Sequence, residues 1–229
     1  MAEQIRERLV QVREQIARAA ERAGRSAEDI TLIAVSKTFD SATVQQAVDA
    51  GARDLGENRV QEAITKVAIV KGKVRWHLIG HLQSNKARQA VEAFEVIHTI
   101  DSSHLAERLD RVAGETGRRP EVLVQVDLAH EPAKSGADES ELPAIVEALD
   151  SARHLEFRGL MTLPPFFDSP EQTRPYFRRL REILEGLNRG RGPEEKLTEL
   201  SMGMSHDFEA AIEEGATMVR VGTAIFGSR

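Results

Sequence analysis

Cysteine is absent from this sequence of 229 residues, which excludes disulfides, thiolate metal sites and a cysteine nucleophile. Long apolar runs are missing too, since no stretch approaches the roughly 20 residues that a membrane-spanning helix needs. The N-terminus, MAEQIRERLVQVREQ, is charged throughout and lacks the apolar segment of a signal peptide. We therefore expect a cytoplasmic protein that does not associate with membranes.

An excess of positive charge is also lacking. The formal net charge is −6, and the arginines are interleaved with Asp and Glu as on solvated helix faces. A nucleic-acid-binding protein usually carries a basic stripe, and none is seen. We expect no nucleic-acid partner.

Short β-branched segments alternate with helical patterns along the chain. An initial helix, assigned to residues 1–24, carries Ile5, Leu9, Val12 and Ile16 on one stripe and is expected to pack on the rest of the domain. Strands are then expected at 31–37, 53–57, 75–80, 96–101, 121–128, 156–163, 197–203 and 217–222.

Eight β-α units in a chain of this length predict a single α/β domain over 1–229. The predicted fold is a (β/α)8 TIM-type barrel with an extra N-terminal helix. The alternative is an open doubly wound sheet, but no GxGxxG motif follows an early strand.

Lys37 ends the first predicted strand. Strand alternation places it on the same face as Ile33 and Val35, so it points into the barrel if they do. A lysine there is costly to bury charged and suits a Schiff base. From position alone, a solvent-exposed lysine just past the strand is the simpler interpretation.

Arg220 lies within the last predicted strand, between outward-facing Val219 and Val221, and is expected to point inward with Met218. A buried guanidinium needs a partner or a ligand. Binding a ligand and pairing with a glutamate from another strand are equally compatible with the pattern.

Two loops are suited to hold a phosphate. The loop after the seventh strand contains Ser205, and the loop after the eighth opens with Gly222 and Thr223. Barrels often bind phosphate with these two loops, through backbone N–H groups at a helix start. Simple helix capping by Ser205 is the alternative.

Other polar residues are weaker candidates. His77 and His81 flank a strand end without the glutamate of an HExxH motif, so no metal site is expected. Asn58, at the end of the second strand, could contact a ligand or cap a helix.

Six segments together resemble one family of proteins. They are AVSKT around Lys37, LGENRVQE at 55–62, WHLIGHLQSNK at 76–86, RGLMTLPP at 158–165, LSMGMSHDFEAAI at 200–212 and VRVGTAIFG at 219–227. From about Ile5 to Gly227, the chain resembles the pyridoxal 5′-phosphate (PLP) homeostasis proteins, also described as YggS/PROSC-like. Their fold is similar to the N-terminal barrel of alanine racemases.

The resemblance implies a set of cofactor-binding residues. Lys37 would carry PLP as a Schiff base, and Arg220 would lie beside the pyridine nitrogen. Asn58 and Met161 would line the cofactor. Phosphate contacts would come from Ser205, Gly222 and Thr223, near Ser201 and Gly203. In the segment 126–136, Asp127 and Ala133 stand where family members often carry Asn and a polar residue, so these two side chains are not assigned to the cofactor.

The resemblance also implies a function. The chain would hold PLP reversibly, influence vitamin B6 and amino-acid pools, and possess no efficient amino-acid turnover. An arginine at the ring nitrogen disfavours a pyridinium, which leaves a weaker electron sink. Racemisation needs acid-base groups on both faces of the substrate carbon. Alanine racemases take the second-face tyrosine from a separate domain of a partner subunit, whereas this sequence ends at Arg229 and its one tyrosine, Tyr176, is expected on an outer helix.

Two alternative activities remain. One is a PLP-dependent amino-acid racemase or decarboxylase of barrel type, and the other is a phosphate-binding barrel isomerase with Lys37 as an electrophile or aldolase lysine. The barrel is expected to be a monomer, and PLP-requiring apoenzymes are candidate partners.

Overall fold

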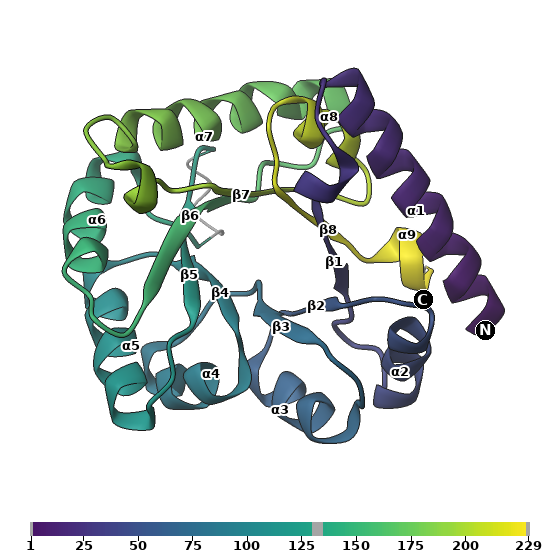
Figure 1. Cartoon of the computed structure of the whole chain (residues 1–229), viewed down its shortest axis with the longest axis horizontal. Helices are drawn as coiled ribbons and strands as arrows, with labels where there is room; N and C mark the ends of the chain where they lie inside the picture. The colour runs from purple at the N-terminus through teal and green to yellow at the C-terminus, as the bar shows by residue number, and fades with distance from the viewer. Residues whose placement is uncertain (1, 130–134, 228–229) are drawn as a thin grey trace.

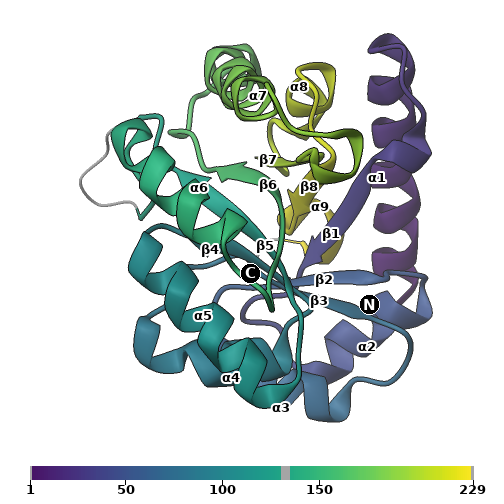
Figure 2. The same cartoon turned by 60° about the vertical axis from the view of Figure 1, so that its left-hand side comes forward.

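The computed structural model describes residues 2–129 and 135–227, and in it eight parallel strands close into a barrel (Figures 1 and 2). The predicted (β/α)8 barrel with an extra N-terminal helix is therefore confirmed. The strands are β1 (Thr31–Val35), β2 (Asp54–Glu57), β3 (Arg75–Leu78), β4 (Val96–Ile100), β5 (Glu121–Val126), β6 (Glu156–Thr162), β7 (Glu199–Met204) and β8 (Met218–Val221).

Helices surround this barrel, as Figure 1 shows. Each strand is followed by a helix on the outside, and α1 precedes the first strand. They are α1 (Ala2–Arg22), α2 (Ser41–Asp49), α3 (Val60–Ile69), α4 (Ala87–Ala93), α5 (Ser103–Thr116), α6 (Leu142–Asp150), α7 (Arg174–Leu187), α8 (Phe208–Glu213) and α9 (Thr223–Phe226). None of these helices is long and apolar enough to cross a membrane, within the part of the chain described.

Alternation along the strands separates two sets of buried side chains. Outward-facing residues such as Ala34 and Leu55 join the large core between barrel and helices. Inward-facing residues crowd together on the barrel axis. A Cβ added to Gly56 would lie 2.9 Å from Cγ2 of Ile33 and 3.1 Å from Cδ1 of Ile79, so only glycine fits there. This contact shows that Ile33 faces the barrel interior, as the alternation predicts.

The first predicted strand is two residues too long. β1 ends at Val35, whereas the sequence pattern extended it to Lys37. The Ser36 N–H still bonds to the Gly56 carbonyl at 3.0 Å, but Thr38 has a φ of +70°. The left-handed conformation at Thr38 turns the chain out of the sheet directly after Lys37.

The N-terminal helix α1 packs on α8, α9 and α2. Its apolar stripe is almost completely buried, because Ile5, Leu9, Val12 and Ile16 are between 1% and 4% exposed. The helix ends at Arg22, close to the end expected from the sequence, and Gly24 then takes a φ of +67°.

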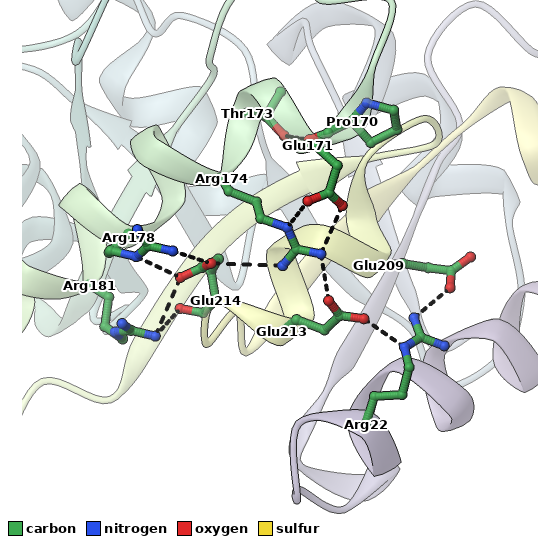
Figure 3. Close-up of polar contacts among 10 residues, drawn as sticks. All are labelled: Arg22, Pro170, Glu171, Thr173, Arg174, Arg178, Arg181, Glu209, Glu213 and Glu214. Carbon is green, nitrogen blue, oxygen red and sulfur yellow. Dashed lines mark hydrogen bonds and ion pairs between the residues drawn. The ribbon is translucent and has the colours of Figure 1, made fainter.

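Ion pairs join this helix to α8 and to the start of α7 (Figure 3). Arg22 contacts Glu209 at 2.8 Å and Glu213 at 2.7 Å. The other oxygen of Glu213 accepts from Arg174 at 2.6 Å, and Arg174 also contacts Glu171 at 2.6 Å. Glu213 thus links α1 and α7 through two arginines.

We expect Arg174→Gln to lower the free energy of unfolding by about 1 kcal/mol, because a partly buried linked pair is lost. Arg179→Gln is the matched control, since Arg179 lies on the same helix but pairs with Glu139 and Glu182. Its cost should be below about 0.5 kcal/mol. Urea denaturation of both variants measures the difference, and equal losses would contradict the linking role of Arg174.

The difference in unfolding free energy between the wild type and Arg174→Gln should also depend on pH. Burial raises the pKa of Glu213, but hydrogen bonds from Arg174 and Arg22 outweigh it and bring the pKa below its ordinary value. A carboxyl group with a lowered pKa stabilises the fold above its unfolded-state pKa and loses this contribution as the pH falls through the folded-state pKa. The gap between the wild type and Arg174→Gln should therefore close as the pH falls from 7 to below 4.5, the ordinary pKa of Glu.

Candidate functional site

Lys37 lies in the turn that follows β1, at the carboxyl end of the barrel, and its side chain is exposed. Its ammonium group makes no hydrogen bond or ion pair with any residue in 2–129 or 135–227. Lys37 thus combines features of the inward and the exposed interpretations. Ile33 of the preceding strand faces the barrel interior, whereas the Lys37 amine itself is accessible. An accessible, uncommitted amine is available to react with a carbonyl.

A cluster of charged side chains, Lys66, Glu57 and Glu62, holds the backbone on both sides of Lys37. Lys66, on α3, donates to the Ser36 carbonyl at 2.7 Å and to Glu57 Oε1 at 2.6 Å. The Ser36 hydroxyl donates to the same Glu57 oxygen at 2.6 Å. Lys66 also contacts Glu62 at 2.9 Å, and Glu62 accepts from the N–H of Thr38. Both residues that flank Lys37 are therefore held by α3 and β2.

This cluster depends on the charge of Lys66. Burial raises the pKa of Glu57, and the hydrogen bonds from Lys66 and Ser36 oppose that rise without cancelling it. Glu57 Oε2 is buried and has no hydrogen-bond partner within the described chain. The carboxylate is thus satisfied on one oxygen only, which makes the Lys66 contact its main stabilising interaction.

Arg220 points into the barrel from β8, as predicted, and is 3% exposed. Its guanidinium donates to the Ser201 hydroxyl at 2.5 Å and to the Thr162 carbonyl at 2.8 Å. The expected alternative, an ion pair with a glutamate, is wrong: no carboxylate contacts Arg220 within the described residues. Burial lowers its pKa to about 10, against the attraction of Asp207. A buried cation bonded only to neutral groups has capacity left for an acceptor on a ligand.

Ser205 connects the two loops suggested for a phosphate. Its hydroxyl oxygen accepts from the N–H of Gly222 at 3.1 Å and from that of Ala224 at 3.5 Å. It does not cap α8, whose N-cap is Asp207, but its oxygen accepts from N–H groups at the start of α9. A hydroxyl and two amide N–H groups therefore lie together at the carboxyl ends of β7 and β8. A phosphate oxygen that replaced the hydroxyl oxygen as their acceptor would be bound by these donors.

Three further candidates lie on or just after β2, β6 and β7. Asn58 follows β2 and is half-buried, and it does not cap α3, whose N-cap is Arg59. Met161 is fully buried in the small interior cluster with Val96 and Leu123. Ser201, on β7, pairs in register with Met161.

Gly203 lies near the carboxyl end of β7, and Thr223 lies just after β8. Thr223 is exposed and starts α9. Gly203 has a φ of +92°, and a Cβ there would lie 2.6 Å from Cβ of Ala211. Glycine at this position allows β7 to approach α8 closely, which is a packing requirement that the sequence reasoning did not identify.

Two histidines inside the barrel were missed as members of a site. His77 and His98 are fully buried, and their rings are hydrogen-bonded to each other at 2.9 Å. His77 had been considered only for a metal pair with His81. Strand alternation could have identified both histidines, because each lies within a strand, two residues from another residue that faces inward.

Other residues singled out in the sequence contact partners outside the candidate set. His81 contacts Asp101 at 3.2 Å and is half exposed. Tyr176 lies on α7 and stacks on Phe167, with ring centroids 5.9 Å apart. Asp127 accepts from the N–H of Ala129 at 3.1 Å, and Ala133 lies outside the described residues. No cluster of three or more possible metal ligands occurs in 2–129 and 135–227.

The candidate residues come from strands that are neighbours in the barrel. The strands β6, β7, β8, β1 and β2 are consecutive neighbours in the closed barrel. Their carboxyl ends therefore bring a free amine, a buried guanidinium and an anion-binding set of donors to one half of the barrel mouth. Such a set can bind a small molecule that carries an aldehyde, a basic ring nitrogen and a phosphate.

Known proteins resemble the chain over nearly its whole length. The model of the alanine racemase N-terminal domain family matches residues 8–229. A curated relative from Pseudomonas aeruginosa, named pyridoxal phosphate homeostasis protein, is 45% identical over 202 residues, which are 87% of this chain and 85% of the relative.

Solved structures agree with this match. PipY of Synechococcus elongatus with PLP bound is 44% identical, with a TM-score of 0.87 over 97% of this chain and 100% of that one. An alanine racemase from Clostridium difficile is 17% identical with a TM-score of 0.78, and 57% of that chain is covered, so this likeness concerns the fold alone. The extent and identity of these matches show that the chain belongs to the family of pyridoxal phosphate homeostasis proteins, whose barrel is that of the alanine racemase N-terminal domain.

Proposed function

We propose that this chain binds PLP as a Schiff base on Lys37 and takes part in intracellular PLP and amino-acid homeostasis, without efficient amino-acid turnover. The observation that carries the proposal is the convergence of Lys37, Arg220 and the Ser205–Gly222 pair on neighbouring strand ends. When bound, PLP supplies an aldehyde for the lysine amine and an aromatic ring that withdraws electrons.

The residues fit the three polar parts of PLP. Lys37 offers an accessible amine, and the Lys66 cluster holds the turn that carries it. Ser205 with the N–H groups of Gly222 and Ala224 would receive the phosphate. Arg220 would donate to the ring nitrogen from inside the barrel. Asn58, Met161, Ser201, Gly203 and Thr223 would complete the walls.

Two features argue against efficient turnover. Arg220 would present donors to the ring nitrogen, which would disfavour a proton there and weaken the ring as an electron sink. The one tyrosine, Tyr176, lies on the outer helix α7, where its ring stacks on Phe167, and we do not assign it as an acid or base. The racemase or decarboxylase alternative rests on fold likeness alone, and no contact in the structure favours it.

The biological setting extends the proposal. The relatives' name, pyridoxal phosphate homeostasis protein, supports a role in the vitamin B6 pool. We propose that a cytoplasmic monomer holds PLP reversibly and passes it to PLP-requiring apoenzymes. A single barrel domain over 1–229, covered at one side by the N-terminal helix, would be the whole PLP-binding unit.

Substituting Lys37 tests the Schiff base directly. Purified protein saturated with PLP should be yellow, and borohydride should fix a PLP-derived mass on the Lys37 peptide. Lys37→Ala should lose both the visible band and the modification, because the aldehyde would lack the amine with which we propose that it condenses. Lys73→Ala, at an exposed lysine before β3, is the matched control and should retain both. An unmodified Lys37 in PLP-saturated wild type would refute the proposal.

Amino-acid turnover separates the homeostasis role from the racemase or decarboxylase alternative. PLP-loaded protein is incubated with single amino acids, and chiral chromatography and CO2 release are followed over many hours. We expect no more product than with Lys37→Ala, because a second-face acid or base is missing from the described site. Sustained turnover that requires Lys37 would favour the enzyme.

The Lys66 cluster predicts a coupled loss of stability and binding. Lys66→Met should lower the free energy of unfolding by about 3 kcal/mol, because Glu57 is left buried without its cation. PLP should also bind several-fold more weakly, since the Lys37 turn loses its anchor at the Ser36 carbonyl.

The double variant Lys66→Met/Glu57→Gln is the matched control. It should recover part of the stability, because the buried charge is removed, but not the PLP affinity. Denaturation and spectroscopic PLP titration measure the two effects, and wild-type affinity in Lys66→Met would contradict the anchoring role.

A further inference from the structure

A continuous chain of hydrogen bonds runs through the barrel interior from Arg220 to Asp54. Arg220 donates to the Ser201 hydroxyl at 2.5 Å, and the Ser201 oxygen lies 2.9 Å from His98 Nδ1. His98 Nε2 lies 2.9 Å from His77 Nδ1, and His77 Nε2 lies 2.9 Å from Asp54 Oδ1. Five side chains from β8, β7, β4, β3 and β2 are thus linked in one line.

One assignment of protons gives every donor in this chain an acceptor and keeps both histidines neutral. Ser201 accepts from Arg220, so its own proton is free to donate to His98 Nδ1. Burial lowers the pKa of His98 well below its ordinary value, and the nearby cations Arg220 and Arg75 lower it further, so that ring is neutral and has one N–H. That proton is then on Nε2 and points to His77 Nδ1. By the same reasoning His77 is protonated on Nε2 and donates to Asp54.

The chain explains how Arg220 is kept in place without a carboxylate in contact. Hydrogen bonds that all run in one direction polarise and strengthen one another in a low-dielectric interior. Asp54, whose side chain is 18% exposed at the start of β2, ends the chain with a negative charge. Without His98 as acceptor, the Ser201 hydroxyl could rotate and present its proton toward the guanidinium instead of its lone pair.

We propose that His98 and His77 are positioning residues, which hold Ser201, and through it Arg220, in the orientation that receives the ring nitrogen of the cofactor. Both imidazoles are neutral and protonated on Nε2. The inference deepens the proposed function and rests on it for the identity of the cofactor. The hydrogen-bond chain itself is a property of the protein alone.

Nitrogen NMR of the full-length protein tests the chain without PLP. Long-range ¹⁵N–¹H correlation distinguishes a protonated from an unprotonated ring nitrogen in each histidine. We expect His77 and His98 to show a protonated Nε2 and an unprotonated Nδ1, with assignments from His77→Gln and His98→Gln. A protonated Nδ1 in either ring would overturn the proposal.

PLP titration tests the positioning role. His98→Phe preserves a ring of similar shape but removes the link, and it should weaken PLP binding roughly tenfold, the effect of one hydrogen bond near a charge. The visible absorption maximum of bound PLP should shift as well. His98→Gln can accept from Ser201 and donate to His77, so it should restore affinity and spectrum to near the wild-type values.

Val122→Ala is the control for lost core packing, because Val122 is fully buried on the outer face of β5 and lies outside the chain. It should bind PLP as the wild type does. Wild-type affinity and spectrum in His98→Phe, or a His98→Gln that fails as badly as His98→Phe, would overturn the positioning role. Should the wild type take up no PLP, the proposed function fails, and the histidine tautomers still decide whether the chain exists.

Discussion

The interior of this barrel is organised around a buried cation, Arg220, that contacts no carboxylate among the described residues. Arg220 is satisfied by a hydroxyl and a backbone carbonyl, and Asp207 attracts it without an ion pair. Such an arrangement is stable only if the neutral partners are held rigidly, because a rotated hydroxyl would leave a charge unsolvated. The sheet provides that rigidity, because the partners lie on β7 and β6, the two strands that precede β8 in the barrel.

The lysine at the end of β1 illustrates a second constraint. Parallel strands fix side chains as far as the hydrogen-bonded ladder extends, and here the ladder ends at Ser36. Beyond it, Thr38 adopts a left-handed conformation that costs a β-branched residue roughly 1–3 kcal/mol. The contacts from Lys66 and Glu62 compensate for this cost. A helix outside the barrel therefore holds the backbone on both sides of Lys37 at the barrel mouth.

The architecture could be predicted from the sequence because it is encoded in the periodic spacing of apolar residues. The β-α alternation, the inward direction of Arg220 and the apolar stripe of α1 all follow from spacing along the chain. Contacts between distant segments left no such signal. The Lys66–Glu57 pair joins α3 to β2, and the His77–His98 pair joins β3 to β4. Alternation along a strand indicates whether a side chain faces the barrel interior or the helices. Only the register between strands decides which two side chains lie within 3 Å of each other, as His77 and His98 do. The residues expected at the cofactor came from family motifs, and their binding roles stay predictions.

The position of α1 has a consequence for how the chain folds. Thr31 pairs with Met218, so the first and last strands form the seam that closes the barrel. Such a contact spans almost the entire chain, and contacts of long sequence separation form slowly because much conformational entropy is lost before they are made. By packing on α2, α8 and α9, helix α1 lies across that seam and buries apolar surface from both ends of the chain. Packing of α1 therefore stabilises the closed barrel, which forms last. A barrel that is still open between β1 and β8 would expose this apolar surface to other chains.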